Sequence, residues 1–203
     1  MRRGYVPIIL VGLLAGATAA VAILPNVRAN LGLSLPGAET TGRALIGGPF
    51  TLTDHTGRRV TEKDFAGRPM VVFFGFTNCP DVCPSGLQVL SAALDKLGPK
   101  ADKLVPIFIS VDPERDTPEQ LAQYVKSFHP RIVGLTGSPE EVASAAKAYR
   151  VYFKKAQNEG AAGSYTIDHS AIFYIMDAAG QYSSHATHST PPEKLAGLIA
   201  RVL

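Results

Sequence analysis

Residues 70–84 read MVVFFGFTNCPDVCP, an apolar run followed by a short polar loop that carries two cysteines. The continuous apolar segment Met70–Phe76 predicts a central strand that is buried on both faces. A helix is expected from Pro84 to Leu97, ending at the Gly98-Pro99 pair. Cys79 and Cys83 therefore lie where a strand meets a helix, and open α/β sheets place their chemistry at this end of a strand.

Strands of similar character are expected later in the chain. The apolar runs Val105–Val111 and Ile172–Met176 predict two further buried strands. Asp177–Gly180 has the composition of a turn and predicts another strand at Gln181–Ser183. Near the start of the domain, Thr51–Val60 has the pattern of a short hairpin.

Three more helices are indicated by their first residues. The pattern Ser/Thr, Pro, any residue, Glu/Gln is typical of a capping box with proline in the first turn. It occurs at 117–120, 138–141 and 190–193, and predicts helices at about Pro118–Phe128, Pro139–Tyr149 and Pro191–Val202. Strands that alternate with helices predict an α/β fold with a central mixed β-sheet flanked by helices.

Composition excludes several classes of protein. The chain has 203 residues, of which 46% are hydrophobic and 18% charged, so it is neither a disordered polymer nor a fibrous repeat. Its net charge is +3, and Arg2 and Arg3 account for most of that charge. Since no basic tract follows, we expect no nucleic-acid partner.

The amino terminus predicts a membrane anchor. Tyr5–Leu24 is an uncharged apolar stretch, and about twenty helical residues span the roughly 30 Å of a bilayer core. The arginines before it predict that the rest of the chain crosses the membrane. A cleaved signal peptide is the alternative, because Ala17-Thr18-Ala19 has the form of a cleavage site.

These features divide the chain into an anchor at 1–25, a linker at 26–48 and a globular domain at 49–203. No residues before Arg2 could form an organelle transit peptide. We therefore expect a single-pass protein of a bacterial inner membrane, with its domain facing the periplasm.

The two cysteines are expected to be reactive. The Cys83-Pro84 pair follows the cap-then-proline pattern of the other helices, with sulfur in place of the hydroxyl. This predicts that Cys83 lies at or next to a helix N-cap, where the helix dipole lowers a thiol pKa. If Cys79 shares that turn, the two Cα atoms are about 6 Å apart. That distance suits either a disulfide, in an oxidised form, or two sulfurs on one metal ion.

A purely structural disulfide is the alternative. Closing so short a loop would stabilise the fold by only about 2 kcal/mol, against about 4.7 kcal/mol for a loop of 100 residues. Redox or metal chemistry is therefore the favoured interpretation of Cys79 and Cys83.

Two thiolates rarely complete a metal site, so a third ligand is needed. The chain offers five histidines: His55, His129, His169, His185 and His188. We expect His55 and His129 to be exposed, and His185 and His188 to lie in a solvated loop. His169 is unusual because it is expected to begin the apolar strand Ala171–Met176, yet on its own a structural role for it is equally acceptable.

Three segments together resemble one known family. FGFTNCPDVCP at 74–84, SVDPERDT at 110–117 and DHS at 168–170 occur in the order found in the SCO/SenC proteins, membrane-tethered copper proteins of cytochrome c oxidase assembly. The resemblance extends over about Pro49–Leu203. It implies a thioredoxin-like fold and one copper ion, as Cu(I) or Cu(II), bound by Cys79, Cys83 and His169. Asp168 is expected to act behind the site or in the fold, because neighbouring strand residues face opposite sides.

The resemblance implies a copper metallochaperone that receives copper from a periplasmic donor and delivers it to the dinuclear copper centre of oxidase subunit II. A thiol–disulfide oxidoreductase that reduces the cysteines of the same target is the alternative, since Cys79 and Cys83 suit exchange chemistry. Copper binding needs His169, whereas dithiol exchange does not. A redoxin-type peroxidase is a third possibility, but no supporting arginine and threonine constellation is evident.

Overall fold

The computed structural model describes residues 45–157 and 165–203. The predicted anchor at 1–25 and most of the predicted linker at 26–48 lie outside these residues. Within the described ranges, no helix is both long enough and apolar enough to cross a bilayer.

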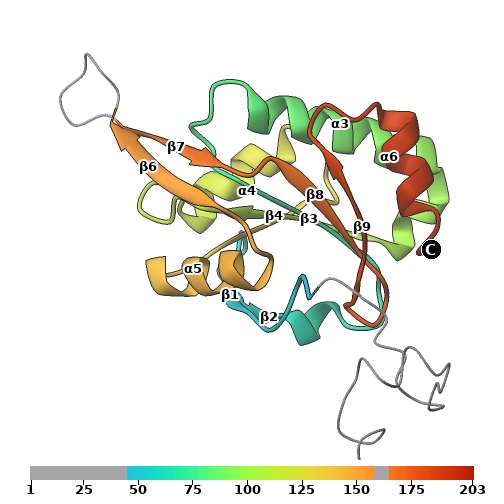
Figure 1. Cartoon of the computed structure of the whole chain (residues 1–203), viewed down its shortest axis with the longest axis horizontal. Helices are drawn as coiled ribbons and strands as arrows, with labels where there is room; N and C mark the ends of the chain where they lie inside the picture. Colours follow the sequence, from blue (N-terminus) through green and yellow to red (C-terminus); the bar gives the residue numbers. More distant parts are fainter. Residues whose placement is uncertain (1–44, 158–164) are drawn as a thin grey trace, which may run out of the picture. The chain divides into compact units, whose positions relative to one another are not determined.

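A seven-stranded mixed sheet forms the centre of the domain, in the order β2-β1-β5-β4-β3-β8-β9 (Figure 1). Its strands are β1 (Thr51–Asp54), β2 (Arg59–Thr61), β3 (Met70–Gly75), β4 (Val105–Ser110), β5 (Val133–Thr136), β8 (Ile172–Met176) and β9 (Tyr182–Thr187). β3 pairs in parallel with β4 and antiparallel with β8. The predicted central strand is therefore confirmed, and every residue of β3 is buried.

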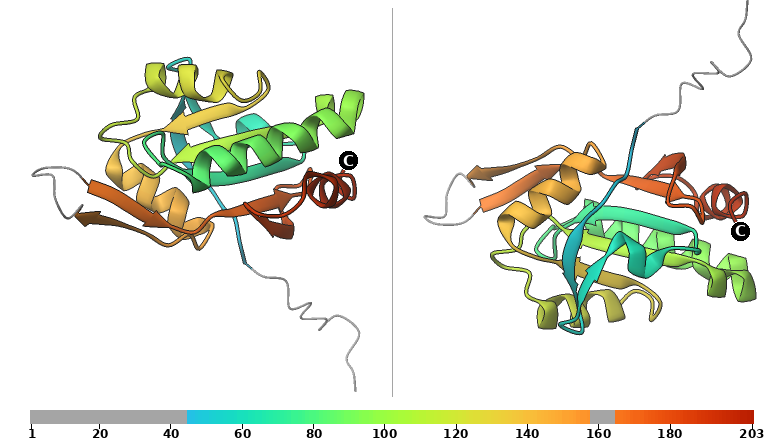
Figure 2. Two further views of the ribbon diagram at one scale, coloured as in Figure 1. Left: turned by 90° about the horizontal axis from the view of Figure 1, so that it is seen from above. Right: turned by 90° about the horizontal axis from the view of Figure 1, so that it is seen from below.

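Helices cover both faces of this sheet. They are α3 (Val82–Leu97), α4 (Pro118–Lys126), α5 (Pro139–Ala148) and α6 (Pro192–Ile199), with short 3-10 helices η1 (Glu62–Phe65) and η2 (Gly98–Lys103). α3 and α4 connect successive parallel strands, and right-handed crossovers place both on one face. α6 packs beside α3, and the two views of Figure 2 show α5 on the opposite face.

Two aromatic layers fill the core. On the face covered by α3 and α4, Phe73 contacts Phe108 and Phe173 at ring-centroid distances of 6.3 and 4.7 Å. On the other face, Phe74 lies 5.4 Å from Tyr149, the C-cap residue of α5. Adjacent residues of one strand thus serve opposite layers, which is why the β3 sequence is apolar without alternation.

Two of the three predicted capping boxes are confirmed, at Thr117 and Ser138. The third is wrong: α6 starts at Pro192 with Pro191 as its N-cap, and the Thr190 hydroxyl instead accepts from the Thr187 N–H. Pro192 disfavours helical geometry at the residue before it, so the helix cannot include Pro191.

A second, two-stranded sheet was not predicted. β6 (Phe153–Gln157) pairs antiparallel with β7 (Tyr165–His169). The expectation that His169 begins the strand of 171–176 is therefore wrong, since His169 ends β7 and β8 starts at Ile172. Much of this hairpin is solvent-exposed and carries lysines, so its sequence has no apolar run that would indicate a strand.

Candidate metal centre

The two cysteines lie on either side of the start of α3. The helix begins at Val82, so Cys83 is its second residue and is fully buried, whereas Cys79 precedes the helix and is half-buried. The backbone N–H of Cys83 donates to Sγ of Cys79 at 3.4 Å. The sulfur that accepts from the helix start is therefore that of Cys79, not that of Cys83 as the sequence pattern suggested.

His169 reaches the same place from the end of β7. Its Nε2 lies 3.2 Å from Sγ of Cys83. The three predicted ligand atoms, one from each of Cys79, Cys83 and His169, all lie within 4.8 Å of one another. Neither of these two cysteines forms a disulfide in this structure. Elsewhere in the part of the chain that the structure describes, no other group of three potential ligand side chains comes this close.

The surroundings of His169 orient its ring. Nδ1 lies 3.3 Å from the carbonyl oxygen of Ser170. A carbonyl can only accept, so with its proton on Nδ1 the ring donates to Ser170 and leaves the lone pair of Nε2 for a metal. The ring of Phe76 meets the imidazole edge-on at 5.7 Å and limits its rotation.

The two thiols differ strongly in acidity. A hydrogen bond from Cys83, supported by His169, lowers the pKa of Cys79 to about 4. That same hydrogen bond and burial raise the pKa of Cys83 well above its usual range. The expectation that the helix terminus activates Cys83 is therefore wrong. Cys79, the more exposed sulfur, is the thiolate in the metal-free protein, because Cys83 is buried and serves as its donor.

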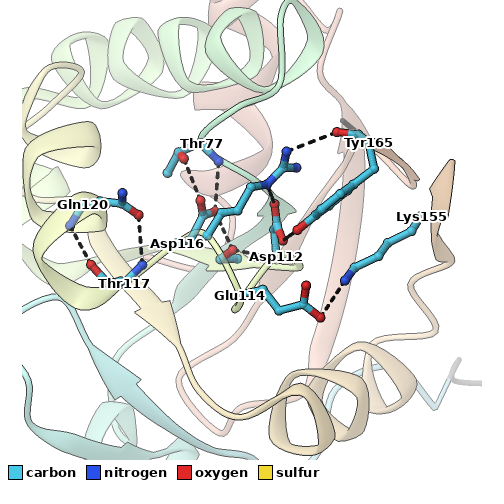
Figure 3. Close-up of polar contacts among 10 residues, drawn as sticks. Thr77, Asp112, Glu114, Asp116, Thr117, Gln120, Lys155 and Tyr165 are labelled. Atoms are coloured by element: carbon cyan, nitrogen blue, oxygen red, sulfur yellow. Dashed lines mark hydrogen bonds and ion pairs between the residues drawn. The ribbon is translucent and has the colours of Figure 1, made fainter. Parts of the chain in front are cut away.

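A buried carboxylate holds the cysteine loop in place. Asp116 accepts from the N–H of Thr77 at 2.9 Å and from its hydroxyl at 2.6 Å, and it also accepts from the hydroxyl of Ser110 at 2.6 Å (Figure 3). Asp116 is fully buried, and this burial raises its pKa. Asp116 thus ties the loop that carries Cys79 to Ser110 at the end of β4. The sequence alone did not predict this role for the segment at 110–117.

A hollow of about 300 Å³ gives access to the site. It is lined by residues of the cysteine loop and of β7: Phe76, Cys79, Pro80, Asp81, Val82, Thr166, Ile167, Asp168 and His169. Asp168 is exposed and lies beside the ligand cluster rather than in it. A hollow of about 360 Å³ lies at Phe65, Met70 and Tyr149 and contains neither cysteine nor histidine, so the smaller one is the chemically relevant space.

The remaining histidines lie outside the cluster. His185 belongs to β9 rather than to a loop, and its Nδ1 lies 2.6 Å from the hydroxyl of Tyr182. His188 follows that strand. His55 and His129 are partly buried rather than exposed, and Nδ1 of His55 accepts from the N–H of Gly134 at 3.0 Å.

Comparison with known families agrees with this geometry. The SCO1/SenC family profile matches residues 38–203, which is most of the chain. The chain belongs to the SCO1/SenC family. Its thioredoxin-like α/β fold, with a mixed sheet flanked by helices, is the Sco fold.

Solved SCO1/SenC structures include copper complexes. The structure of Bradyrhizobium japonicum ScoI with copper bound is 47% identical, covers 78% of this chain and 99% of that one, and has a TM-score of 0.72. Yeast Sco1 with copper bound is 41% identical, with coverage of 77% and 87% and a TM-score of 0.71.

Several curated relatives are longer than this chain. The mitochondrial SCO1 homolog 1 of Arabidopsis thaliana is 51% identical over 138 residues, which are 68% of this chain and 41% of that protein. The chain spans about half the length of such relatives.

Proposed function

We propose that this protein binds one copper ion through Cys79, Cys83 and His169 and delivers it to the dinuclear copper centre of cytochrome c oxidase subunit II. The observation that carries the proposal is the convergence of these three ligand atoms within 4.8 Å, from two segments far apart in the sequence. Thiolates select Cu(I), and an imidazole also accommodates Cu(II), so this donor set fits copper. Membership in a family whose solved structures include copper complexes supports the same choice.

The arrangement also suits release of the ion. Three protein ligands leave a position for an incoming donor, whereas a closed site of four ligands would favour retention. The half-buried Cys79 faces the hollow, while Cys83 lies behind it. A target thiolate that enters the hollow can therefore bind the copper before Cys79 dissociates from it.

Thiol–disulfide exchange is the second candidate function, favoured by the unequal acidity of the two thiols. The Cys79 thiolate would attack a disulfide of the target and form a mixed disulfide, which releases one target thiolate. Cys83 would give up its proton and attack Cys79, releasing the second target thiolate. Two electrons pass to the target, and a Cys79–Cys83 disulfide remains.

We also propose the cellular setting in which this chemistry takes place. Residues 1–25 would anchor the protein in a bacterial inner membrane, residues 26–48 would link the anchor to the domain, and the domain at 49–203 would face the periplasm. A periplasmic donor would supply the copper. The apolar sequence at Tyr5–Leu24 and the two arginines before it support this placement.

Single substitutions test the ligand set. We expect Cys79→Ala, Cys83→Ala and His169→Ala each to weaken Cu(I) binding by more than about a hundredfold, because even residues behind a metal ligand cost 10- to 100-fold when removed. Anaerobic titration against a competing chelator measures the affinity. His185→Ala is the matched control, since it removes an imidazole outside the cluster, and it should bind like the wild type.

Transfer experiments separate the two candidate functions. The His169→Ala variant should lose copper transfer to the apo copper domain of subunit II yet still reduce that domain's disulfide. Full copper affinity in this variant, together with loss of reductase activity, would exclude the chaperone function.

A further inference from the structure

Arg115 joins the segment after β4 to the hairpin that carries His169. Its Nε donates to the carboxylate of Asp112, and its Nη1 donates to the carbonyl oxygen of Tyr165 at 3.1 Å. The guanidinium lies on the Tyr165 ring, 3.8 Å from the centroid. The Tyr165 hydroxyl in turn donates to Asp112 at 2.7 Å (Figure 3). We call these three mutually bonded residues, Arg115, Asp112 and Tyr165, the Arg115 clamp.

The hairpin depends on contacts of this kind. Over the described residues, β6 and β7 form a sheet of their own and share no ladder with the seven-stranded sheet. Tyr165 and His169 are the first and last residues of β7, which pairs with β6 along its whole length. A side chain that holds Tyr165 in place therefore also holds β7 in place, and the His169 imidazole lies at the other end of this strand.

A second contact leads to the same imidazole. The guanidinium carbon of Arg115 lies 5.9 Å from the centroid of the Phe76 ring. That ring meets His169 edge-on at 5.7 Å. Arg115 is thus connected to His169 in two ways: through Tyr165 and strand β7, and through the ring of Phe76.

Fold stability alone is a poor explanation for an arginine at this position. Its side chain is 28% exposed, and within the described part of the chain its buried Nη2 has no hydrogen-bond partner. A buried donor without a partner is costly, and an apolar side chain would avoid that cost.

We propose that Arg115 is a positioning residue of the copper site: it holds the β6–β7 hairpin so that Nε2 of His169 reaches the two sulfurs. The inference rests on the proposed copper binding and adds a residue that acts through His169. The hydrogen bonds of Arg115 go to Asp112 and Tyr165 and not to the cysteine loop, so its removal should weaken copper binding and leave the β3–α3 junction that carries the cysteines in place.

The chain offers a matched control. Lys155 is a second cation on the same ring, with Nζ 4.7 Å from the Tyr165 centroid, and it pairs with Glu114 at 2.6 Å on the exposed side. Arg115→Met should weaken Cu(I) binding roughly tenfold in the chelator titration, as expected for a residue behind a ligand. Lys155→Met should bind like the wild type, because exposed ion pairs contribute little.

Two measurements exclude a general loss of folding. In the metal-free protein, amide hydrogen exchange at residues 165–169 should quicken in Arg115→Met and remain at the wild-type rate in Lys155→Met, and exchange in β3 and β4 should be the same in all three proteins. Should Arg115→Met fail to fold, Arg115→Lys carries the test. It keeps a cation beside Asp112 but lacks the planar fork that bonds Asp112 and Tyr165 together, so its affinity should fall between those of the wild type and His169→Ala.

A double-mutant cycle with His169 decides the outcome. In the His169→Ala background, Arg115→Met should weaken binding no further. Equal weakening in both backgrounds, or wild-type affinity in Arg115→Met, overturns the positioning role while leaving the copper site intact. Wild-type affinity in His169→Ala itself would instead overturn the proposed function.

Discussion

At the scale of single residues, the site combines two sulfurs in very different environments. Cys79 is half-buried beside a hollow, while Cys83 is fully buried behind it. The difference in acidity follows from this, because the buried thiol of Cys83 donates a hydrogen bond to the more accessible sulfur of Cys79. One sulfur is thus ready for exchange, and the other becomes a ligand only when it loses its proton.

Selective alkylation of the metal-free protein tests this asymmetry. Because the pKa of Cys79 is lowered to about 4, this residue is a thiolate throughout the neutral range. Its rate of reaction with iodoacetamide should therefore change little between about pH 6 and pH 8, and Cys83 should remain unmodified. Peptide mass spectrometry after timed quenching locates and counts the label. A rate that rises roughly tenfold per pH unit would mean that Cys79 has an ordinary thiol pKa.

At the scale of elements, the close approach of β3 and α3 fixes the position of the Cys83 sulfur. Gly75 is the last residue of β3 and lies against the Cys83 side chain. A Cβ added at Gly75 would lie 2.7 Å from Sγ of Cys83 and 2.8 Å from Cε2 of Phe108. Only a residue without a side chain allows the strand and the helix to pack at this distance.

Substitution of Gly75 should therefore disturb both the fold and the site. We expect Gly75→Ala to lower the free energy of unfolding by about 1–3 kcal/mol, the usual cost of overpacking, and to weaken copper binding because the sulfur moves. Urea unfolding and the chelator titration measure the two effects. Gly197→Ala in α6 is the control, since nothing lies within 4 Å of its added Cβ, and it should be neutral or stabilising. Equal behaviour of the two variants would show that β3 and α3 do not constrain the sulfur.

Elements with strong local signals were predictable from the sequence. The apolar runs of β3, β4 and β8 and the capping boxes of α4 and α5 appear where they were expected. The β6–β7 hairpin was missed because its exposed faces carry lysines rather than an apolar pattern. Its absence from the prediction also placed His169 at the start of the wrong strand.

At the scale of the whole domain, the site exists because three separate parts of the fold meet. The β3–α3 junction supplies the sulfurs, and the β6–β7 hairpin supplies His169. The segment after β4 supplies Asp116, which bonds Thr77, and the Asp112 and Arg115 side chains, which bond Tyr165 of the hairpin (Figure 3). The sequence identified the three candidate ligands, partly through a family resemblance. It could not show the polar contacts behind them, because long-range pairs such as Thr77 with Asp116 leave no local pattern.

The central claim is that Cys79, Cys83 and His169 bind one copper ion together. X-ray absorption spectroscopy of the protein loaded with one equivalent of Cu(I) tests it most directly, with His169→Ala measured beside it. We predict two sulfur donors and one imidazole nitrogen in the wild type, and loss of the imidazole signal in the variant. An unchanged imidazole signal in His169→Ala, or a wild-type spectrum without two sulfurs, would contradict the account.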